Sequence, residues 1–431
     1  MNFLWTQGLT PPEGRTLRGT RRAEVCVIGG GMAGVLCAAQ LTARGVETVL
    51  VEAKQLGGGI TKGTTAVLTA QHDLQYQKLV QLYGAERAKQ YLHANLRGLR
   101  RLRELASDID CELETIPSAM FSVDGQDGLK QEAETLRALG FDAEYTAHPD
   151  LPFPAADAVI FPDMAQFHPL KFLYGVAERL DFYTDTFVTK LDGTSVVTDH
   201  GRVLAKHIVV ATHFPFVNRR GLYFVKQHQQ RSYVIAYRGA PRLACTAADA
   251  GEGFYFRNYR DLLLIGGGDH RTGRNGGGFY AVEAFARRYF PRAQEVCRWA
   301  NQDCVTLDAV PYIGRYSPAM PHVYVATGFN LWGMTTAMAA AELLCDQIQG
   351  RDNPDAAVFA PDRRVLHPQL FANLGAAIGA FVIPTTRRCP HMGCALRYNN
   401  AEHSWDCPCH GSRFDAHGRL IDNPARRDAH V

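Results

Sequence analysis

The sequence lacks a dominant charge, a long apolar run and an internal repeat. Its 46 lysines and arginines nearly balance 43 acidic residues, for a net charge of +3. The basic residues are dispersed, so no nucleic-acid partner is expected. No stretch reaches the roughly 18 apolar residues that a membrane span needs, and no secretory signal opens the chain. These absences predict a cytoplasmic protein without a membrane-spanning segment.

The size and composition are those of an ordinary globular protein. The 431 residues allow two to three domains, and the hydrophobic content is 46% with 21% charge. Eleven cysteines are present, and four of them gather between residues 389 and 409. Disulfides are uncommon in the cytosol, so the scattered cysteines are predicted to be buried thiols that behave as small hydrophobes.

A glycine-rich turn near the start is the first strong motif. Residues 24–28 predict a buried strand, and the run Gly29-Gly-Gly31-Met32-Ala33-Gly34 follows at once. Residues 35–44 have helical apolar spacing, and residues 47–51 form a second apolar strand that ends in Glu52 and Ala53. A strand, a G-x-G-x-x-G turn, a helix and an acidic residue in this order predict a dinucleotide site.

Each residue of this turn has an expected role. Gly29 allows the tight turn, Gly31 lets the pyrophosphate approach the backbone, and Gly34 lets helix and strand pack closely. The helix N-terminus offers N–H groups and a positive dipole end to the phosphates. Glu52 is expected to accept hydrogen bonds from the ribose hydroxyls.

A second glycine turn favours FAD over NAD. The stretch 323–335 contains Gly328, Gly333, Met334 and Thr335, and a helix is predicted over residues 335–349. A helix start here would stabilise negative charge on a reduced flavin ring; the alternative is an ordinary βα turn. A third run, Ile265 to Arg271, has no helix after it, so no second dinucleotide site and no NAD(P)H-fed reductase is expected.

Two short runs near the C-terminus indicate a metal centre. Cys389 and His391 form a C-x-H pair, and Cys407 and His410 form a C-x-x-H pair. Two thiolates and two imidazoles from facing loops suit a [2Fe–2S] cluster with sulfur on one iron and nitrogen on the other. A Cys2His2 zinc site is the alternative, but zinc leaves Cys394 and Cys409 in the same loops unexplained.

These motifs carry a family resemblance. With Gly57 to Thr65, Ile208 to Thr212 and Asp308 to Gly314, residues 23–350 resemble the D-amino-acid-oxidase-type FAD-dependent oxidoreductases. The C-terminal runs resemble a Rieske [2Fe-2S] domain. The whole chain is similar to a bacterial group of fused FAD–Rieske oxidoreductases.

The resemblance implies further site residues. It implies that Thr61, Thr64 and Thr65 approach the flavin, that Val188 touches the adenine through its backbone, and that Ala211 and Thr212 lie along the FAD. In the tail it implies a Cys394–Cys409 disulfide. Ser412 matches the hydroxyl that binds a bridging sulfide, and Phe414 stands where high-potential members have a tyrosine. The missing hydroxyl should lower the reduction potential.

The predicted fold class is α/β. We expect a Rossmann-like FAD-binding domain with an antiparallel substrate-binding sheet over residues 1–350, a linker over residues 351–388 and a short β-rich Rieske module over residues 389–431. The substrate sheet includes residues 231–238 and 253–268, and the linker has one helix around residues 368–379. The tail holds two ligand loops and one hairpin, so part of the cluster's shelter must come from the FAD domain.

The predicted function follows from the two cofactors. Flavin takes two electrons together and the cluster takes one, so we expect oxidation of a small amine and transfer of single electrons to an acceptor protein. Family members that act on amino acids clamp the carboxylate with an arginine, and residues 299–304 contain none. Two alternatives stay open: a reductase fed by a ferredoxin-like donor, and a non-enzymatic redox sensor. The candidate pocket residues are Tyr233, Tyr255, His270 and Trp332.

Overall fold

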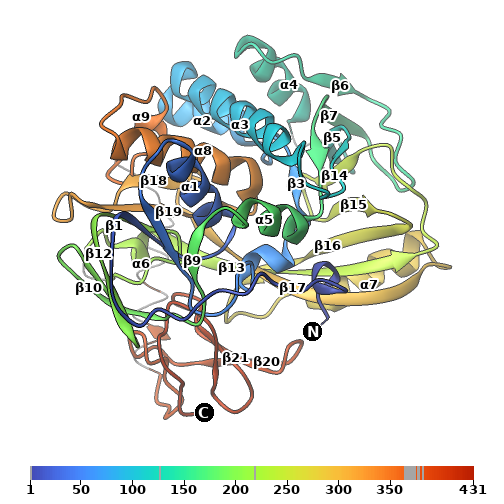
Figure 1. Ribbon diagram of the computed structural model, residues 1–431. Helices are drawn as coiled ribbons and strands as arrows, with labels where there is room; N and C mark the ends of the chain where they lie inside the picture. Colours follow the sequence, from blue (N-terminus) through green and yellow to red (C-terminus); the bar gives the residue numbers. More distant parts are fainter. Residues whose placement is uncertain (1, 126–127, 218–219, 364–374, 376–378, 381–382) are drawn as a thin grey trace.

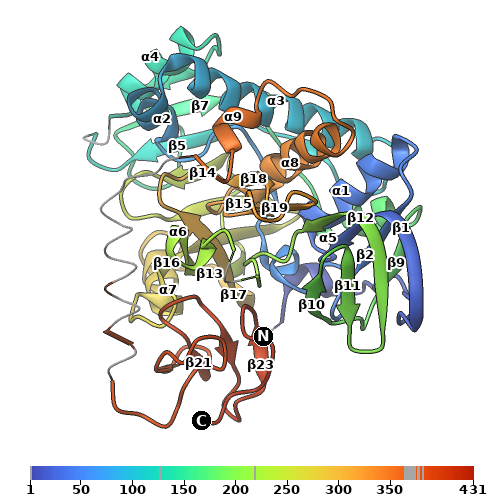
Figure 2. The same ribbon diagram turned by 90° about the vertical axis from the view of Figure 1, so that its left-hand side faces the viewer.

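The computed structural model describes residues 2–125, 128–217, 220–363, 375, 379–380 and 383–431 (Figure 1). Two eight-stranded sheets form the body of this part of the chain, and a four-stranded sheet lies at its C-terminal end. Helices α2, α3 and α4 lie at the far side of the molecule from that small sheet (Figure 1, Figure 2).

The first large sheet has the parallel core that the N-terminal sequence predicts. β1 is parallel to β2 and to β12, and β12 is parallel to β19. Val25 and Val27 pack into one apolar cluster, whereas Cys26 and Ile28 pack into another. Both faces of the sheet are therefore buried here, which is why residues 25–28 of β1 are apolar at every position. The strands are β1 (Gly19–Ile28), β2 (Thr48–Val51), β9 (Asp181–Tyr183), β10 (Val188–Asp192), β11 (Ser195–Thr198), β12 (Gly201–Val210), β18 (Tyr312–Arg315) and β19 (Val323–Thr327).

Helices cover this sheet and extend beyond it. α1 follows β1 directly, and α8 follows β19 after a five-residue turn. The predicted helices after both glycine turns are thus confirmed. The helices are α1 (Met32–Ala43), α2 (Gln75–Tyr83), α3 (Ala85–Ala106), α4 (Leu129–Ala138), α5 (Pro169–Ala177), α6 (Tyr223–Lys226), α7 (Gly278–Tyr289), α8 (Gly333–Ile348) and α9 (Ala356–Phe359), with short 3-10 turns η1 (Leu4–Thr6) and η2 (Ile60–Gly63).

The second large sheet is the expected antiparallel one. Its order is β17-β13-β16-β15-β14-β5-β7-β6, and all neighbours are antiparallel except β14 and β5. Its strands are β5 (Ser118–Ser122), β6 (Glu144–Thr146), β7 (Asp157–Phe161), β13 (Gln227–Arg238), β14 (Thr246–Asp249), β15 (Tyr255–Tyr259), β16 (Leu262–Arg271) and β17 (Gln294–Thr306). A three-stranded sheet of β3 (Val67–Leu68), β4 (Glu114–Thr115) and β8 (Ala165–Gln166) lies apart from it.

The C-terminal tail folds into a small antiparallel sheet in the order β20-β21-β22-β23. Its strands are β20 (Arg397–Asn399), β21 (Ser404–Asp406), β22 (Arg413–Phe414) and β23 (Leu420–Asp422). The predicted hairpin is β20–β21, and β22–β23 adds a second hairpin that the sequence did not indicate. The small sheet lies below β13 and β17 in both views (Figure 1, Figure 2).

The α/β class is confirmed. The helix expected around residues 368–379 falls almost entirely outside the described residues. Among the described residues, no helix has both the length and the apolarity to cross a membrane.

Candidate flavin, iron–sulfur and substrate sites

The glycine turn after β1 is built from contacts that leave no room for side chains. Gly29 has φ of +112°, and a Cβ on it would lie 2.5 Å from the carbonyl oxygen of Ala211. A Cβ on Gly34 would lie 1.9 Å from the carbonyl oxygen of Gly29. The tight turn and the close helix–strand packing predicted for these two glycines are therefore found. They bring the N-terminus of α1 to the edge of the sheet, where it can face a phosphate.

The acidic residue after β2 is held by backbone groups. The N–H of Gly30 donates to Glu52 Oε2 at 2.7 Å, and the N–H of Lys54 donates to Oε1 at 2.9 Å. Burial raises the pKa of Glu52 despite these bonds. Each carboxylate oxygen keeps a lone pair beyond its backbone bond. Those lone pairs could accept the ribose hydroxyls that the sequence analysis assigns to Glu52.

The residues expected to hold the cofactor follow the carboxyl ends of parallel strands. Gly29 to Gly34 follow β1, Glu52 and Ala53 follow β2, Ala211 and Thr212 follow β12, and Gly328 follows β19. The carboxyl ends of parallel strands meet at one edge of a sheet, where open α/β folds bind their ligands. The structure thus brings these segments to one edge.

The remaining cofactor candidates surround this edge. Thr61 Oγ1 accepts the N–H of Met32 at 3.1 Å, which ties η2 to the start of α1. Val188 comes two residues after Thr186, whose N–H donates to the carbonyl oxygen of Glu52 at 2.9 Å. The hydroxyl of Thr335 differs from the expectation for its segment, because it is buried and donates to the carbonyl oxygen of Thr69 at 2.9 Å. Its side chain is committed to packing α8, so a cofactor contact there would use the backbone.

The C-terminal ligand candidates form two pairs. Cys389 and Cys407 are 1% and 0% exposed, and contact with the Cys407 thiol, together with burial, raises the pKa of Cys389. The ring centroids of His391 and His410 are 4.9 Å apart, and the two rings are perpendicular. Both ring nitrogens of His391 and Nδ1 of His410 are buried and have no hydrogen-bond partner within the described part of the chain. Unpartnered buried nitrogens are costly unless they bind something, so this donor set fits a metal cluster.

The two additional cysteines lie beside this group. The Sγ atoms of Cys394, Cys407 and Cys409 are all within 4.8 Å of one another. The structure holds Cys394 and Cys409 as free thiols, whereas a disulfide needs about 2.05 Å between sulfurs. The Cys394–Cys409 disulfide therefore stays a prediction.

The second ligand loop is bound to the large antiparallel sheet. Gln229 of β13 donates from Nε2 to the carbonyl oxygen of His410 at 2.6 Å, and Gln302 of β17 donates from Nε2 to that of Gly411 at 2.9 Å. The rings of Phe214 and Phe224 lie 6.2 and 5.8 Å from the ring of His410. These contacts supply the shelter that the short tail lacks.

A buried ion network also joins the tail to β13. Arg231 donates from Nε and one terminal nitrogen to Glu402, at 2.9 and 2.5 Å. Arg413 binds the same Glu402 at 2.6 Å and Asp406 at 3.1 Å. The side chains of Arg231, Glu402 and Arg413 are 2%, 0% and 6% exposed. No sequence motif indicated this network.

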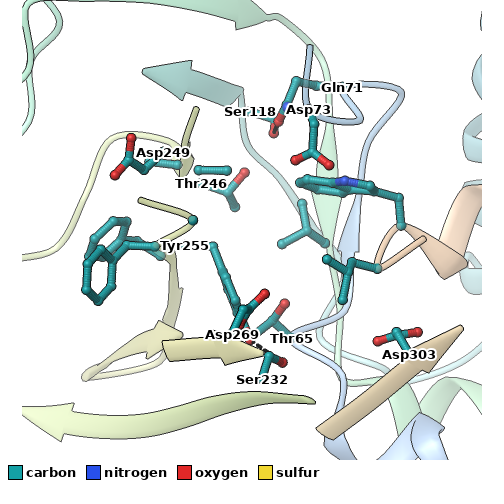
Figure 3. A pocket seen from close by; sticks show the side chains of 18 of the residues that line it. Thr65, Gln71, Asp73, Ser118, Ser232, Thr246, Asp249, Tyr255, Asp269 and Asp303 are labelled. Atoms are coloured by element: carbon teal, nitrogen blue, oxygen red, sulfur yellow. Dashed lines mark hydrogen bonds between the residues drawn. The ribbon is translucent and has the colours of Figure 1, made fainter. Parts of the chain in front are cut away.

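A cavity of about 370 Å³ lies between strands β14 to β17 and the turn before α8 (Figure 3). Thr64 and Thr65, expected near the flavin, line it together with the pocket candidates Tyr255 and Trp332. Expected flavin contacts and expected substrate contacts thus meet in one space. The sequence analysis did not predict that Asp269 and Asp303 also line this cavity, because the two residues come from separate strands.

The other two pocket candidates lie elsewhere. Tyr233 and His270 line a separate hollow of about 880 Å³, between β16, α7 and the β20–β21 hairpin. The hydroxyl of Tyr233 and His270 Nε2 are 2.9 Å apart, and the rings are stacked. The structure brings these two residues to each other rather than to the cavity of Tyr255 and Trp332.

Comparison with protein families decides the class. Residues 24–347 match the model of the DAO family, described as FAD dependent oxidoreductases. The chain belongs to the FAD-dependent oxidoreductase family. Residues 379–430 match the Rieske [2Fe-2S] domain, so this oxidoreductase carries FAD and a [2Fe-2S] cluster in one polypeptide.

Individual relatives agree with this assignment. YhfW of Bacillus subtilis strain 168, provisionally named as a Rieske 2Fe-2S iron-sulfur protein, is 29% identical over 98% of this chain and 95% of its own. The iron-sulfur subunit of the cytochrome b6-f complex of Arabidopsis thaliana is 49% identical over 37 residues, which are 9% of this chain and 16% of that one.

Solved structures share the fold of the FAD domain. Glycine oxidase from Geobacillus kaustophilus superposes with a TM-score of 0.66 at 21% identity, covering 80% of this chain and 100% of its own. L-proline dehydrogenase from P. horikoshii gives 0.68 at 16% identity, covering 79% and 97%. At these identities the likeness shows the fold alone.

The position of Phe414 in the Rieske domain leads to a first prediction. Phe414 is 0% exposed and packs in the same apolar cluster as Cys389 and Cys407. A tyrosine there would offer a hydroxyl to a ligand sulfur, which favours the reduced and more negative cluster. We expect Phe414→Tyr to raise the reduction potential by about 60 mV, the one-electron equivalent of a hydrogen bond worth about 1.4 kcal/mol. A redox titration followed by electron paramagnetic resonance measures this change.

The control for this prediction is Ser412→Ala. It removes a hydroxyl that is 0% exposed, and we expect it to lower the reduction potential instead. An unchanged or lower potential in Phe414→Tyr with intact iron content would contradict the role assigned to position 414.

Proposed function

We propose that this chain oxidises a small amine at the C–H bond next to nitrogen and delivers the electrons singly to an acceptor protein. The amine loses two electrons and two protons to become an imine, which water hydrolyses to a carbonyl compound and an amine or ammonia. Two molecules of a one-electron acceptor each take one electron. When bound, FAD accepts the electron pair and the cluster passes single electrons onward.

One observation carries this proposal: the substrate cavity and the cluster loop use opposite faces of the same two strands. On β17, Asn301 and Asp303 line the cavity, whereas Gln302 between them binds the loop of His410. On β13, Gln230 lines the cavity and Gln229 binds the loop. Alternate side chains of a strand point to opposite faces, so one sheet, with packed layers about 10 Å apart, separates the two sites.

The charges of the cavity support an amine rather than an amino acid. Among the described residues, no arginine lines the cavity, and the charged lining residues are four aspartates and Lys78. A carboxylate held bidentately needs the fork of an arginine. Asp303, in the stretch where amino-acid-oxidising relatives are expected to have that arginine, would instead repel a substrate carboxylate.

The test uses protein purified without air. Anaerobic addition of a saturating small amine should bleach the flavin absorbance and produce the low-temperature paramagnetic resonance signal of a reduced Rieske cluster. In Cys407→Ser that signal should vanish, and reduction of a one-electron acceptor should fall at least 100-fold, because a cluster ligand is lost. Cys245→Ser, which changes a thiol that is no ligand candidate, is the matched control.

Two results would count against the proposal. Flavin that stays oxidised with every amine, yet is reduced by a ferredoxin-like donor, would indicate that electrons flow in the opposite direction. Cys407→Ser protein that reduces the acceptor at the wild-type rate would mean that the electrons bypass the cluster.

A further inference from the structure

The substrate cavity has a strong excess of negative charge. Asp73 precedes α2, Asp249 ends β14, Asp269 lies in β16 and Asp303 in β17, and all four line the cavity (Figure 3). Lys78 is the one cationic side chain among its described lining residues, and it is exposed. The carboxylates of Asp73 and Asp269 project toward the space at the centre of the view (Figure 3).

Asp269 and Asp303 are not neutralised by neighbouring residues. Gln230 donates to Asp269 Oδ2 at 3.2 Å, but Asp269 Oδ1 is buried and has no hydrogen-bond partner among the residues that the structure describes. No ion pair within the described residues includes Asp269 or Asp303. Arg231, whose charge acts on Asp303, is itself bound by Glu402. Two half-buried carboxyls that line one cavity, with no cation paired to either among the described residues, leave a place for an external cation.

The titration of the two carboxyls agrees with this geometry. Burial raises the pKa of Asp269 to about 7, and the charge of Asp73 contributes to the increase. Burial also raises the pKa of Asp303 to about 7, with a contribution from Asp269. The empty cavity therefore favours the neutral form of both carboxyls near pH 7, and a bound cation would favour their ionised forms.

The walls between the carboxylates suit an aliphatic chain. Phe254, Tyr255, Phe256, Leu331 and Trp332 line the cavity. Aromatic faces attract both methylene groups and ammonium ions. Gln71 also lines this space; the residue is 1% exposed, and its Nε2 has no hydrogen-bond partner in the described part of the chain. This buried polar group is a second sign that the cavity receives a ligand.

A metal ion fits the cavity poorly. Within the described residues, the metal-like group of three ligand atoms within 4.8 Å is the cysteine group of the Rieske domain, and the aspartates of the cavity form no such group. Separated anions along an apolar wall match separated charges on one flexible molecule better than a single ion.

From this arrangement we infer that the substrate is a linear aliphatic diamine or polyamine, with one nitrogen at the oxidation site and a second ammonium held by Asp269 and Asp303. The inference rests on the proposed function for the reaction, and it adds the substrate class. It also explains why the chain has no arginine at the carboxylate position, because the group bound there is a cation.

The test compares three ligands with the same number of carbon atoms on the FAD- and cluster-loaded protein. They are butylamine with one cation, 1,4-diaminobutane with two, and 4-aminobutanoate, whose fourth carbon is a carboxylate instead of an aminomethyl group. Dissociation constants are read from the perturbation of the oxidised flavin spectrum immediately after anaerobic mixing. We expect the diamine to bind at least 10-fold more tightly than butylamine, since a charged hydrogen bond contributes about 1.5–3 kcal/mol. The amino acid should bind most weakly.

Substitutions of Asp303 and Asp269 test whether these two residues cause the tighter binding of the diamine. Asp303→Asn and Asp269→Asn keep the side-chain shape and should each reduce the diamine's advantage over butylamine to less than about 3-fold, with little change for butylamine. Asp303→Glu, which keeps the negative charge, should retain more of the diamine's advantage than Asp303→Asn does. Glu252→Gln, an exposed residue beside Asp249, changes the same charge outside the cavity and should leave the 10-fold advantage intact. Flavin content and unfolding temperature check that each variant is folded.

The outcomes separate the inference from the proposed function. A diamine that binds preferentially through Asp303 but leaves the flavin oxidised supports this inference and contradicts the amine oxidation. Butylamine that reduces the flavin, while the diamine shows no advantage in wild-type protein, overturns this inference and leaves the amine oxidation standing.

Discussion

Gly34→Ala should abolish FAD binding. The added Cβ would lie 1.9 Å from the carbonyl oxygen of Gly29, and that neighbour is backbone, which cannot rotate away. Relief requires α1 to move off β1, and this movement would open the turn that is expected to hold the pyrophosphate. We expect at least a 100-fold weaker affinity for FAD and protein that purifies without yellow colour. Flavin absorbance per polypeptide, followed by titration of the apoprotein with FAD, gives the result.

Gly379→Ala is the matched control for this substitution. Nothing lies within 4 Å of a Cβ at Gly379, which is exposed and lies outside the FAD domain. It should retain full flavin content. Gly34→Ala protein that binds a full equivalent of FAD and unfolds at the wild-type temperature would show that the close packing of α1 on β1 is dispensable.

The parts of the site that the sequence predicts are those made by short, continuous segments. The turn from Gly29 to Gly34 is one such segment, because the strand before it and the helix after it have their own apolar periodicity. The pairs Cys389–His391 and Cys407–His410 are another, because each ligand pair is close in sequence. Local spacing is sufficient in both cases, and the structure brings the residues together as expected.

The three glycines that follow Ile265 lie within strand β16 and not in a dinucleotide-binding turn. The sequence correctly predicts that no dinucleotide turn forms, but it gives no reason for the glycines. In the structure a Cβ on Gly266 would lie 2.0 Å from the ring of Tyr255 on the neighbouring strand. The glycine thus makes room for an aromatic wall of the cavity, and this requirement depends on the pairing of β15 with β16.

The substrate side of the site could be predicted only in part. Tyr233 and Tyr255 are both aromatic residues in predicted strands, and composition does not distinguish them. Which of them meets the cavity depends on strand register, because a shift of one residue moves a side chain to the other face. Asp269 and Asp303 are 34 residues apart, and nothing local to either carboxylate indicates that they share a cavity.

The ion network of the tail is the clearest long-range feature, since Arg231 and Glu402 are separated by 171 residues. Glu402 binds Arg231 of β13 and Arg413 of β22 at once. All three side chains are almost fully buried, and a buried ion pair that loses one partner leaves an uncompensated charge. The network therefore links the folding of the small sheet to its docking on the FAD domain.

Glu402→Ala should release the Rieske domain. Without this carboxylate, the buried guanidinium groups of Arg231 and Arg413 lose a shared anionic partner. We expect this loss to lower the stability of the docked module by about 3–5 kcal/mol. That cost is comparable to the whole stability expected of so small a module. We expect the cluster to be lost, with iron content below about 10% of wild type, while the flavin content stays near one per chain. Iron analysis, flavin absorbance and the Rieske paramagnetic resonance signal measure these quantities on the same sample.

Two comparisons make this prediction specific. Glu402→Gln keeps the shape and some hydrogen bonds, so it should retain more iron than the alanine variant. Glu24→Ala removes a carboxylate from an exposed pair with Lys206, whose side chains are 44% and 71% exposed, and such pairs contribute little to stability. Equal iron content in Glu402→Ala and Glu24→Ala would mean that the hydrogen bonds of Gln229 and Gln302 hold the domain by themselves. If iron and flavin were lost together, the network would instead stabilise the chain as one unit, because β13 belongs to the sheet that lines the substrate cavity.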